Sequence, residues 1–222
     1  MTPRVSRLAK GFTLMELLIV VGLISLLSAV FISVLGGGGK SVALEAGQST
    51  LVQLVTALRT RALAANTTVR LLVRNRTDAA DYRRLIVVVQ EEAGIWRAVD
   101  SYQLPANIYV LPYRTRVPSG MYPIAAEWRT SDNSEVLGSS SLNRAPVTFD
   151  YDAGAESWEY LGFTANGTME TGAGSLVIAV GRPTSPTESG GSPAILTDPA
   201  STRGIQVSTY GLPRLINERT GF

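Results

Sequence analysis

The sequence has no cysteine and no histidine among its 222 residues. The absence of cysteine excludes disulfides, and the absence of both residues excludes Ser-His-Asp and Cys-His catalytic groups and the usual zinc and copper ligand sets. Carboxylate pairs remain at Glu91-Glu92 and at Asp150 and Asp152. Asp152 lies just before Gly154, which favours a solvated turn over acid-base chemistry. We therefore expect no enzymatic activity, no metal or other cofactor, and no small-molecule substrate.

The first 35 residues combine a short basic leader with a long apolar run. Basic residues at positions 4, 7 and 10 precede the run, and residues 17–35 contain no charged side chain. These 19 residues would extend about 28 Å as a helix, enough to cross the hydrocarbon core of a bilayer. The excess of basic residues before the run places the leader in the cytoplasm and the rest of the chain outside.

The candidate cleavage site, Gly11-Phe12, lies before the apolar run. An ordinary secretory signal is cleaved after its apolar region, so cleavage at Gly11 would instead leave the apolar helix on the mature chain. Glu16 lies at the start of this helix, where an ionised carboxylate beside lipid costs about 2–4 kcal/mol unless it is paired. The new amino group of Phe12 in one chain and Glu16 in a neighbouring chain would compensate each other.

Cleavage after Gly11 also changes the net charge. The complete sequence has 20 Lys and Arg residues and 18 Asp and Glu residues, and loss of the three basic leader residues leaves 17 against 18. The mature chain is then close to neutral, at −1. This balance predicts no general attraction to nucleic acid.

The segment from Lys10 to Leu14 (KGFTL), together with Glu16 and the apolar run, resembles the class III signal of type IV pilins and type II secretion pseudopilins. The resemblance implies that a prepilin peptidase cleaves after Gly11 and methylates the amine of Phe12, and that Glu16 acts in filament assembly. It implies three partners: the peptidase, other pilin or pseudopilin subunits, and the assembly platform of the inner membrane. The chain would be a single-pass inner-membrane protein with an exported head, and later part of a periplasmic or cell-surface filament.

The sequence after the leader divides into three regions. Residues 12–39 form the predicted membrane and filament-core helix, whose four glycines at 36–39 predict a flexible break or a simple linker, since each glycine costs about 1 kcal/mol of helix stability. The run GGGGKS lacks the first glycine of a phosphate-binding loop and follows no strand. Residues 40–66 predict an amphipathic helix, because no proline lies between Pro3 and Pro105 and apolar residues recur at a helical period. Its predicted buried stripe is Leu44, Leu51, Leu54, Val55, Leu58, Ala62 and Ala65.

Residues 67–222 predict a β-rich head. Short apolar runs separated by Gly, Pro, Asn and Asp indicate strands at 69–74, 84–90, 96–102, 108–113, 147–151, 157–164, 175–180 and 204–208. A helix that precedes mainly antiparallel strands predicts an α+β fold, with the helix packed on one face of the sheet. Two stretches, 118–146 and 182–204, are predicted loop insertions, and the second is rich in Pro and Gly and is expected to be exposed.

Three segments resemble the minor pseudopilin H and FimT/FimU family within this superfamily: 58–73, 162–180 and 205–215. The resemblance implies a minor subunit of a type IV pilus or type II secretion pseudopilus, at the tip or in the initiation complex. Many pilins have a disulfide near the C-terminus, whereas this chain must hold that end by packing and hydrogen bonds.

DNA binding in a natural-transformation pilus is the alternative function. FimT-type proteins bind DNA through a basic turn of the form GRxR, and the matching residues here are Gly211-Leu212-Pro213-Arg214, with leucine in place of one arginine. Arg203, Arg214 and Arg219 could still form a small basic patch with Tyr210. Three such contacts predict only weak, salt-sensitive binding.

Overall fold

The computed structural model describes residues 14–77, 80–143, 158–184 and 192–222, and the side chains of all of these except residues 16 and 26–38. Its helix is α1 (Leu14–Ala65). Its strands are β1 (Val69–Arg74), β2 (Leu85–Glu92), β3 (Ile95–Gln103), β4 (Ile108–Val110), β5 (Trp158–Phe163), β6 (Gly174–Pro183), β7 (Ala194–Leu196), β8 (Thr202–Val207) and β9 (Pro213–Ile216). Short 3₁₀ helices are η1 (Arg114–Arg116), η2 (Ala125–Glu127) and η3 (Arg219–Gly221). The predicted α+β class is confirmed.

Helix α1 runs without interruption through the four glycines at 36–39. The helix break predicted there is therefore absent from the backbone. The chain nevertheless divides into two compact units at this position, Met1–Gly39 and Lys40–Phe222. Where side chains are described, no helix has a stretch both long and apolar enough to cross a membrane.

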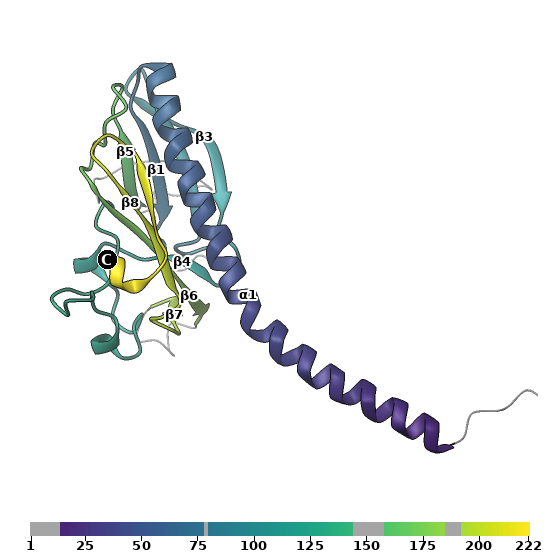
Figure 1. Ribbon diagram of the computed structural model, residues 1–222. Coiled ribbons are helices and arrows are strands. Elements are labelled where there is room, and N and C mark those ends of the chain that lie inside the picture. The colour runs from purple at the N-terminus through teal and green to yellow at the C-terminus, as the bar shows by residue number, and fades with distance from the viewer. Residues whose placement is uncertain (1–13, 78–79, 144–157, 185–191) are drawn as a thin grey trace, which may run out of the picture. The chain divides into compact units, whose positions relative to one another are not determined.

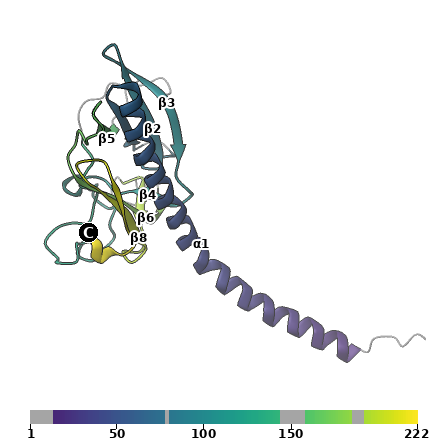
Figure 2. The same ribbon diagram turned by 45° about the horizontal axis from the view of Figure 1, so that its top comes forward.

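The unit Lys40–Phe222, called the head below, contains two antiparallel sheets. The strand order is β3-β2-β1-β5 in the first and β4-β6-β8-β9 in the second, where β7 also pairs with β6. Figures 1 and 2 show the C-terminal half of α1 lying along strands of both sheets. The helix thus covers one face of each sheet, as the sequence predicts.

The largest cluster of buried side chains lies between α1 and the two sheets. The helix contributes Leu44, Leu51, Leu54, Val55, Leu58 and Ala62. Alternate residues of the strands face them, for example Leu71 and Val73 from β1 and Ile178 from β6. One member of the predicted stripe is wrong, because Ala65 is exposed. Gln48, which is not in the predicted stripe, is buried with 3% of its surface accessible.

The opposite face of the second sheet is covered by the long segment that follows β4. Met121, Tyr122 and Trp128 from this segment are buried with Ala179 of β6. The rings of Tyr122 and Trp128 stack on each other, with centroids 4.7 Å apart. The insertion predicted at 118–146 therefore contributes several side chains to the core, while its residues 123–127 and 131–135 are exposed.

The exposed loop predicted at 182–204 differs from the structure in its second half. Ala194 and Leu196 of β7 are fully buried, and β8 begins at Thr202. Their burial follows from pairing of β7 with the end of β6, from Gly181 to Pro183. The segment 182–204 has too few apolar residues to form a core of its own. Ala194 and Leu196 are instead buried in the core that β6 already belongs to.

The other strand predictions have mixed outcomes. The strand at 69–74 has the predicted bounds, and β2, β3, β5, β6 and β8 lie within a few residues of theirs. The strand expected at 108–113 ends at Val110, and the one expected at 147–151 lies outside the described residues. The strands β7 and β9 were not predicted, because runs of three and four residues give no period to recognise.

Candidate assembly site

The predicted processing residues, Gly11 and Phe12, lie outside the described part of the chain. Glu16 belongs to the first turn of α1, which begins at Leu14, and its side chain is not described. Cleavage, methylation and the pairing of Glu16 therefore stay predictions. What the structure adds is that Glu16 belongs to a helix, α1, from the first described residue onward.

Within the head, Gln48 ties α1 to the C-terminal strands. Its Nε2 donates one hydrogen bond to the carbonyl oxygen of Gly204 in β8, at 2.7 Å, and one to that of Ile216 in β9, at 2.9 Å. Both amide hydrogens are therefore used, and the buried amide avoids the cost of an unsatisfied polar group. This contact fixes the helix against the edge of the second sheet.

The last residues of the chain close over the same place. A Cβ added at Gly204 would lie 2.3 Å from the carbonyl oxygen of Leu176 and 2.9 Å from the Phe222 ring, so only glycine fits between the strand and the C-terminal ring. Arg219 donates from Nε to the carbonyl oxygen of Arg129 at 2.8 Å. Packing and hydrogen bonds thus hold this end of the chain without a disulfide.

The three arginines proposed for DNA contact do not form one patch. In β8, Arg203 shares a face with Ile205, toward α1, and its guanidinium lies 3.5 Å from the Ser41 hydroxyl. Arg214 in β9 pairs with Gln206, which is on the opposite face of β8. Since Arg219 is bound to a main-chain carbonyl, a shared DNA-binding surface of all three has no support.

A buried ion pair joins the chain just before β2 to β5 of the same sheet. Arg83 donates from Nη1 to Oε2 of Glu159 at 2.6 Å, and both side chains are 1% exposed. Burial alone would lower the pKa of the Arg83 guanidinium, but the adjacent carboxylate outweighs burial, and the pKa is raised. The main chain of Arg83 also accepts from the Val110 amide, at 2.9 Å, so the residue bonds to strands of both sheets.

On the outer face of the first sheet, Arg70 lies between two aromatic rings. Its guanidinium carbon is 4.3 Å from the ring centroids of Trp96 and of Tyr160, and Nε donates to Glu170 at 2.8 Å. Cation–π contacts and the ion pair fix the side chain across three strands. Arg70 and Glu170 neutralise each other, so we assign this arrangement a role in stabilising the sheet.

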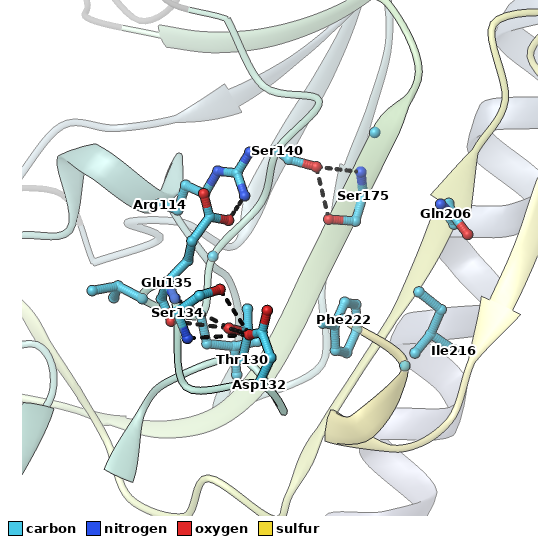
Figure 3. Close-up of a pocket in the computed structure, with 15 residues that line it drawn as sticks. Arg114, Thr130, Asp132, Ser134, Glu135, Ser140, Ser175, Gln206, Ile216 and Phe222 are labelled. Atoms are coloured by element: carbon cyan, nitrogen blue, oxygen red, sulfur yellow. Dashed lines mark hydrogen bonds and ion pairs between the residues drawn. The ribbon is translucent and has the colours of Figure 1, made fainter. Parts of the chain in front are cut away.

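A cleft of about 270 Å³ lies between residues 130–140 and the C-terminal strands (Figure 3). Arg114 pairs with Glu135 on one side, and Phe222 and Ile216 line the other. Asp132 accepts from the hydroxyls of Thr130 and Ser134, and these bonds lower its pKa to about 2. A carboxylate with so low a pKa is a poor proton donor or acceptor near neutral pH.

No described cluster of His, Cys, Asp or Glu side chains has three members placed to hold a metal ion. Among the described carboxylates, Glu92 pairs with Arg97 at 3.2 Å, while Asp150 and Asp152 lie outside the described residues.

Comparisons with known proteins give matches among solved structures alone. No protein-family model matches the sequence. No curated protein matches it either. The crystal structure of the type IV minor pilin FimU of Pseudomonas aeruginosa is similar, with a TM-score of 0.41 and 11% identity over 78% of this chain and 87% of that chain. The minor pseudopilin EpsH of the type 2 secretion system of Vibrio cholerae is similar with a TM-score of 0.38 and 11% identity, over 76% and 92% of the two chains. Because these similarities are distant, the residues of this chain carry the functional proposal.

Sequence reasoning missed the polar residues that organise the head. Gln48 lies in line with the apolar stripe, four residues after Leu44, but a polar side chain gives no sign of burial there. Nothing local marks Arg83 and Glu159, which are 76 residues apart, as partners. One signal was available for Arg83 and Glu159. Arg83 immediately precedes a strand, and Glu159 lies between aromatic residues of another, where a charge needs a partner.

Proposed function

We propose that the chain is a minor pilin or minor pseudopilin, a structural subunit of a type IV pilus or type II secretion pseudopilus. A prepilin peptidase cleaves after Gly11 and methylates the amine of Phe12. The apolar helix holds the exported head at the inner membrane until the assembly platform moves the subunit into the tip or initiation complex of the filament. Glu16 then pairs with the amine of a neighbouring subunit.

The observation that carries this proposal is the continuity of α1. The helix that contains Glu16 continues from Leu14, the first described residue, to Ala65, and its C-terminal half supplies part of the core of the head. Cleavage at Gly11 would therefore leave this helix on the mature chain, with Glu16 near its new N-terminus. Glu16 and the buried stripe of the head thus belong to one element of secondary structure.

The surface of α1 near its start supports the same function. The large apolar side chains at 14, 15, 17–21, 23 and 24 are all exposed. A helix that exposes apolar side chains around its circumference needs lipid or other apolar helices to cover it. A membrane followed by a bundle of neighbouring subunits would supply both in turn.

Mass spectrometry of purified surface filaments tests the proposal. The expected N-terminal peptide begins at Phe12 and is heavier by one methyl group. A Glu16→Val chain should be cleaved normally but be depleted from filaments at least tenfold, whereas Glu45→Val, which changes an exposed carboxylate further along α1, should assemble as before. A mature chain that begins at Met1, or normal incorporation of the Glu16→Val chain, would show that the proposal is wrong.

A further inference from the structure

Strand β3 forms one edge of the first sheet and is nine residues long, from Ile95 to Gln103. Figures 1 and 2 show β3 at the margin of the head. No main-chain hydrogen bond joins it to any described segment other than β2. An open edge of this length is a template for another extended chain, and natural proteins usually shorten or cover such edges.

The opposite edge of the same sheet, in β5, is closed by main-chain bonds. Tyr160 exchanges two of them with Asn143, at 2.8 and 2.9 Å, and the carbonyl oxygen of Gly162 accepts from the Glu170 amide at 2.8 Å. In the second sheet the edge strands β4 and β9 have only three and four residues. Among the described strands, β3 therefore has the long edge that is left uncovered.

The register shows which residues of β3 face outward. The Leu104 amide donates to the carbonyl oxygen of Arg84 at 2.9 Å, so this pair is bonded, and bonded and non-bonded pairs alternate along antiparallel strands. The main-chain groups of Ser101 and Gln103 therefore point away from β2. The Ser101 amide agrees with this position, because it donates to the neighbouring Asp100 carboxylate, at 2.9 Å.

The first part of β3 follows the same rule in a shifted register. The Glu91 amide donates to the carbonyl oxygen of Thr68, next to β1, at 3.0 Å, so the main chain of Glu91 faces away from β3. Its partner Trp96 and, two residues further on, Ala98 therefore have outward main-chain groups. Val99 has no partner in β2 and separates the two parts. Residues 96, 98, 101 and 103 thus present amides and carbonyls along one edge.

A crevice of about 130 Å³ lies between β3 and α1. Its walls include Leu54 and Ala57 of α1, Val88 of β2 and Tyr102 of β3. The Tyr102 hydroxyl is already bonded to the Asp100 carboxylate, so it needs no new partner. An apolar cavity of about 150 Å³ accommodates a group as large as benzene. The crevice therefore has room for one aliphatic side chain of a strand added beside β3, whose alternate side chains would face α1.

We propose that β3 is a docking edge for an extended segment of another protein, which adds a strand to the first sheet. The exposed main chain determines the chemistry of this partner. It brings its own free amides and carbonyls, together with an aliphatic side chain that enters the crevice beside α1. Main-chain bonds supply affinity in this mode of recognition, and the side-chain pocket supplies specificity. The added strand contacts the head alone and does not require cleavage at Gly11.

A different protein is favoured over a second copy of this chain. Two copies paired antiparallel through β3 would be related by a twofold axis perpendicular to the sheet. This axis would make the C-terminal half of one α1 run opposite to that of the other. Under the proposed function both helices lead to the same membrane, so the arrangement is excluded. The choice between the two partners rests on the proposed function, whereas the added strand does not.

A photocrosslinking amino acid placed at Ile95 of the full-length chain in its native host tests the proposal. Leu212, between β8 and β9, is the matched control position, because both side chains are 59% exposed. We expect one protein adduct from Ile95 that Leu212 does not give. Ala98→Pro should reduce this adduct at least fivefold, because proline removes the outward amide and leaves the bonds to β2 in place. Ala98→Val, which keeps the amide, should leave the adduct unchanged.

Substitutions in α1 test the crevice without altering β3. Ala57→Trp should fill the crevice and reduce the adduct at least fivefold. Ala46→Trp, which adds the same ring to an exposed position about three turns earlier in α1, should not. Because Ala57 is exposed, its substitution should keep a normal unfolding midpoint. This variant therefore decides the question if Ala98→Pro lowers the midpoint.

Four results would overturn the proposal: no adduct at Ile95, the same adduct from Leu212, an adduct with a second copy of this chain, or an adduct that Ala57→Trp leaves unchanged. An unchanged adduct from an Ala98→Pro chain with a normal unfolding midpoint would do so as well. Because the adduct is scored on the full-length chain before or after processing, failure here is distinct from failure of Glu16→Val to block assembly.

Discussion

The side-chain amide of Gln48 lies 2.7 Å from the carbonyl oxygen of Gly204, and this bond joins residues that are 156 positions apart. The same amide also binds the carbonyl oxygen of Ile216. One polar side chain of α1 therefore holds both C-terminal strands of the second sheet. Because the chain has no cysteine, these hydrogen bonds, rather than a disulfide, attach the C-terminal strands to α1.

The first prediction concerns this amide. A Gln48→Met chain keeps the volume of the side chain but leaves two main-chain oxygens without these donors, and we expect it to lose about 1–3 kcal/mol of unfolding free energy. Urea denaturation of the head should show a lower midpoint with an unchanged slope. Gln53→Met is the control, because Gln53 is exposed and binds only the Ser49 hydroxyl. Equal effects of the two substitutions would contradict the role assigned to Gln48.

The second prediction concerns the buried ion pair. Arg83→Met and Glu159→Leu should each destabilise the head by about 3–5 kcal/mol, because each leaves a buried charge without its partner. The double variant should be more stable than either single variant, which a double-mutant cycle will measure as a large coupling energy. The exposed pair of Arg97 and Glu92 is the control, with an expected coupling below about 1 kcal/mol. Additive effects at Arg83 and Glu159 would rule out direct coupling.

The third prediction concerns pH. The pKa of Asp132 is lowered from 3.8 to about 2 by hydrogen bonds from Thr130 and Ser134. Because its folded-state pKa lies below the unfolded value, Asp132 stabilises the fold above the unfolded pKa, and this contribution is lost as the pH falls from about 4 to about 2. NMR titration of the carboxyl carbon should give a midpoint near 2 in the parent chain.

Substitution of the donors should reverse that shift. Thr130→Ala and Ser134→Ala should each move the Asp132 midpoint upward, toward 3.8, while Ser131→Ala, which removes a neighbouring hydroxyl that does not bind the carboxylate, should leave it in place. A midpoint near 3.8 in the parent chain would mean that the bonds do not persist in solution.

Much of the fold could be predicted because its signals are local. The helical period of Leu51, Val55 and Leu58 identifies the buried face of α1, and the apolar alternation of 69–74 gives β1 its correct bounds. The leader motif is local as well, so the predicted cleavage site follows from a few adjacent residues. These signals can be recognised without knowing which distant segments of the chain contact each other.

The features that could not be predicted depend on long-range contacts. The short strand β7 forms because the end of β6 provides a hydrogen-bonding partner. Met121 and Trp128 are buried because they cover the face of β6 that α1 does not cover. The three arginines were grouped by their closeness in sequence, but the pairing of Gln206 with Arg214 places Arg203 and Arg214 on opposite faces. The strand register of β8 and β9, which the composition of this segment does not reveal, determines which face each arginine lies on.

The strand β9 is only four residues long, and it pairs along β8 from Gly204 to Val207. Without β9, this length of β8 would present a row of main-chain amides and carbonyls to any other extended polypeptide. Chains shortened before Pro213 should therefore aggregate out of proportion to the few residues removed.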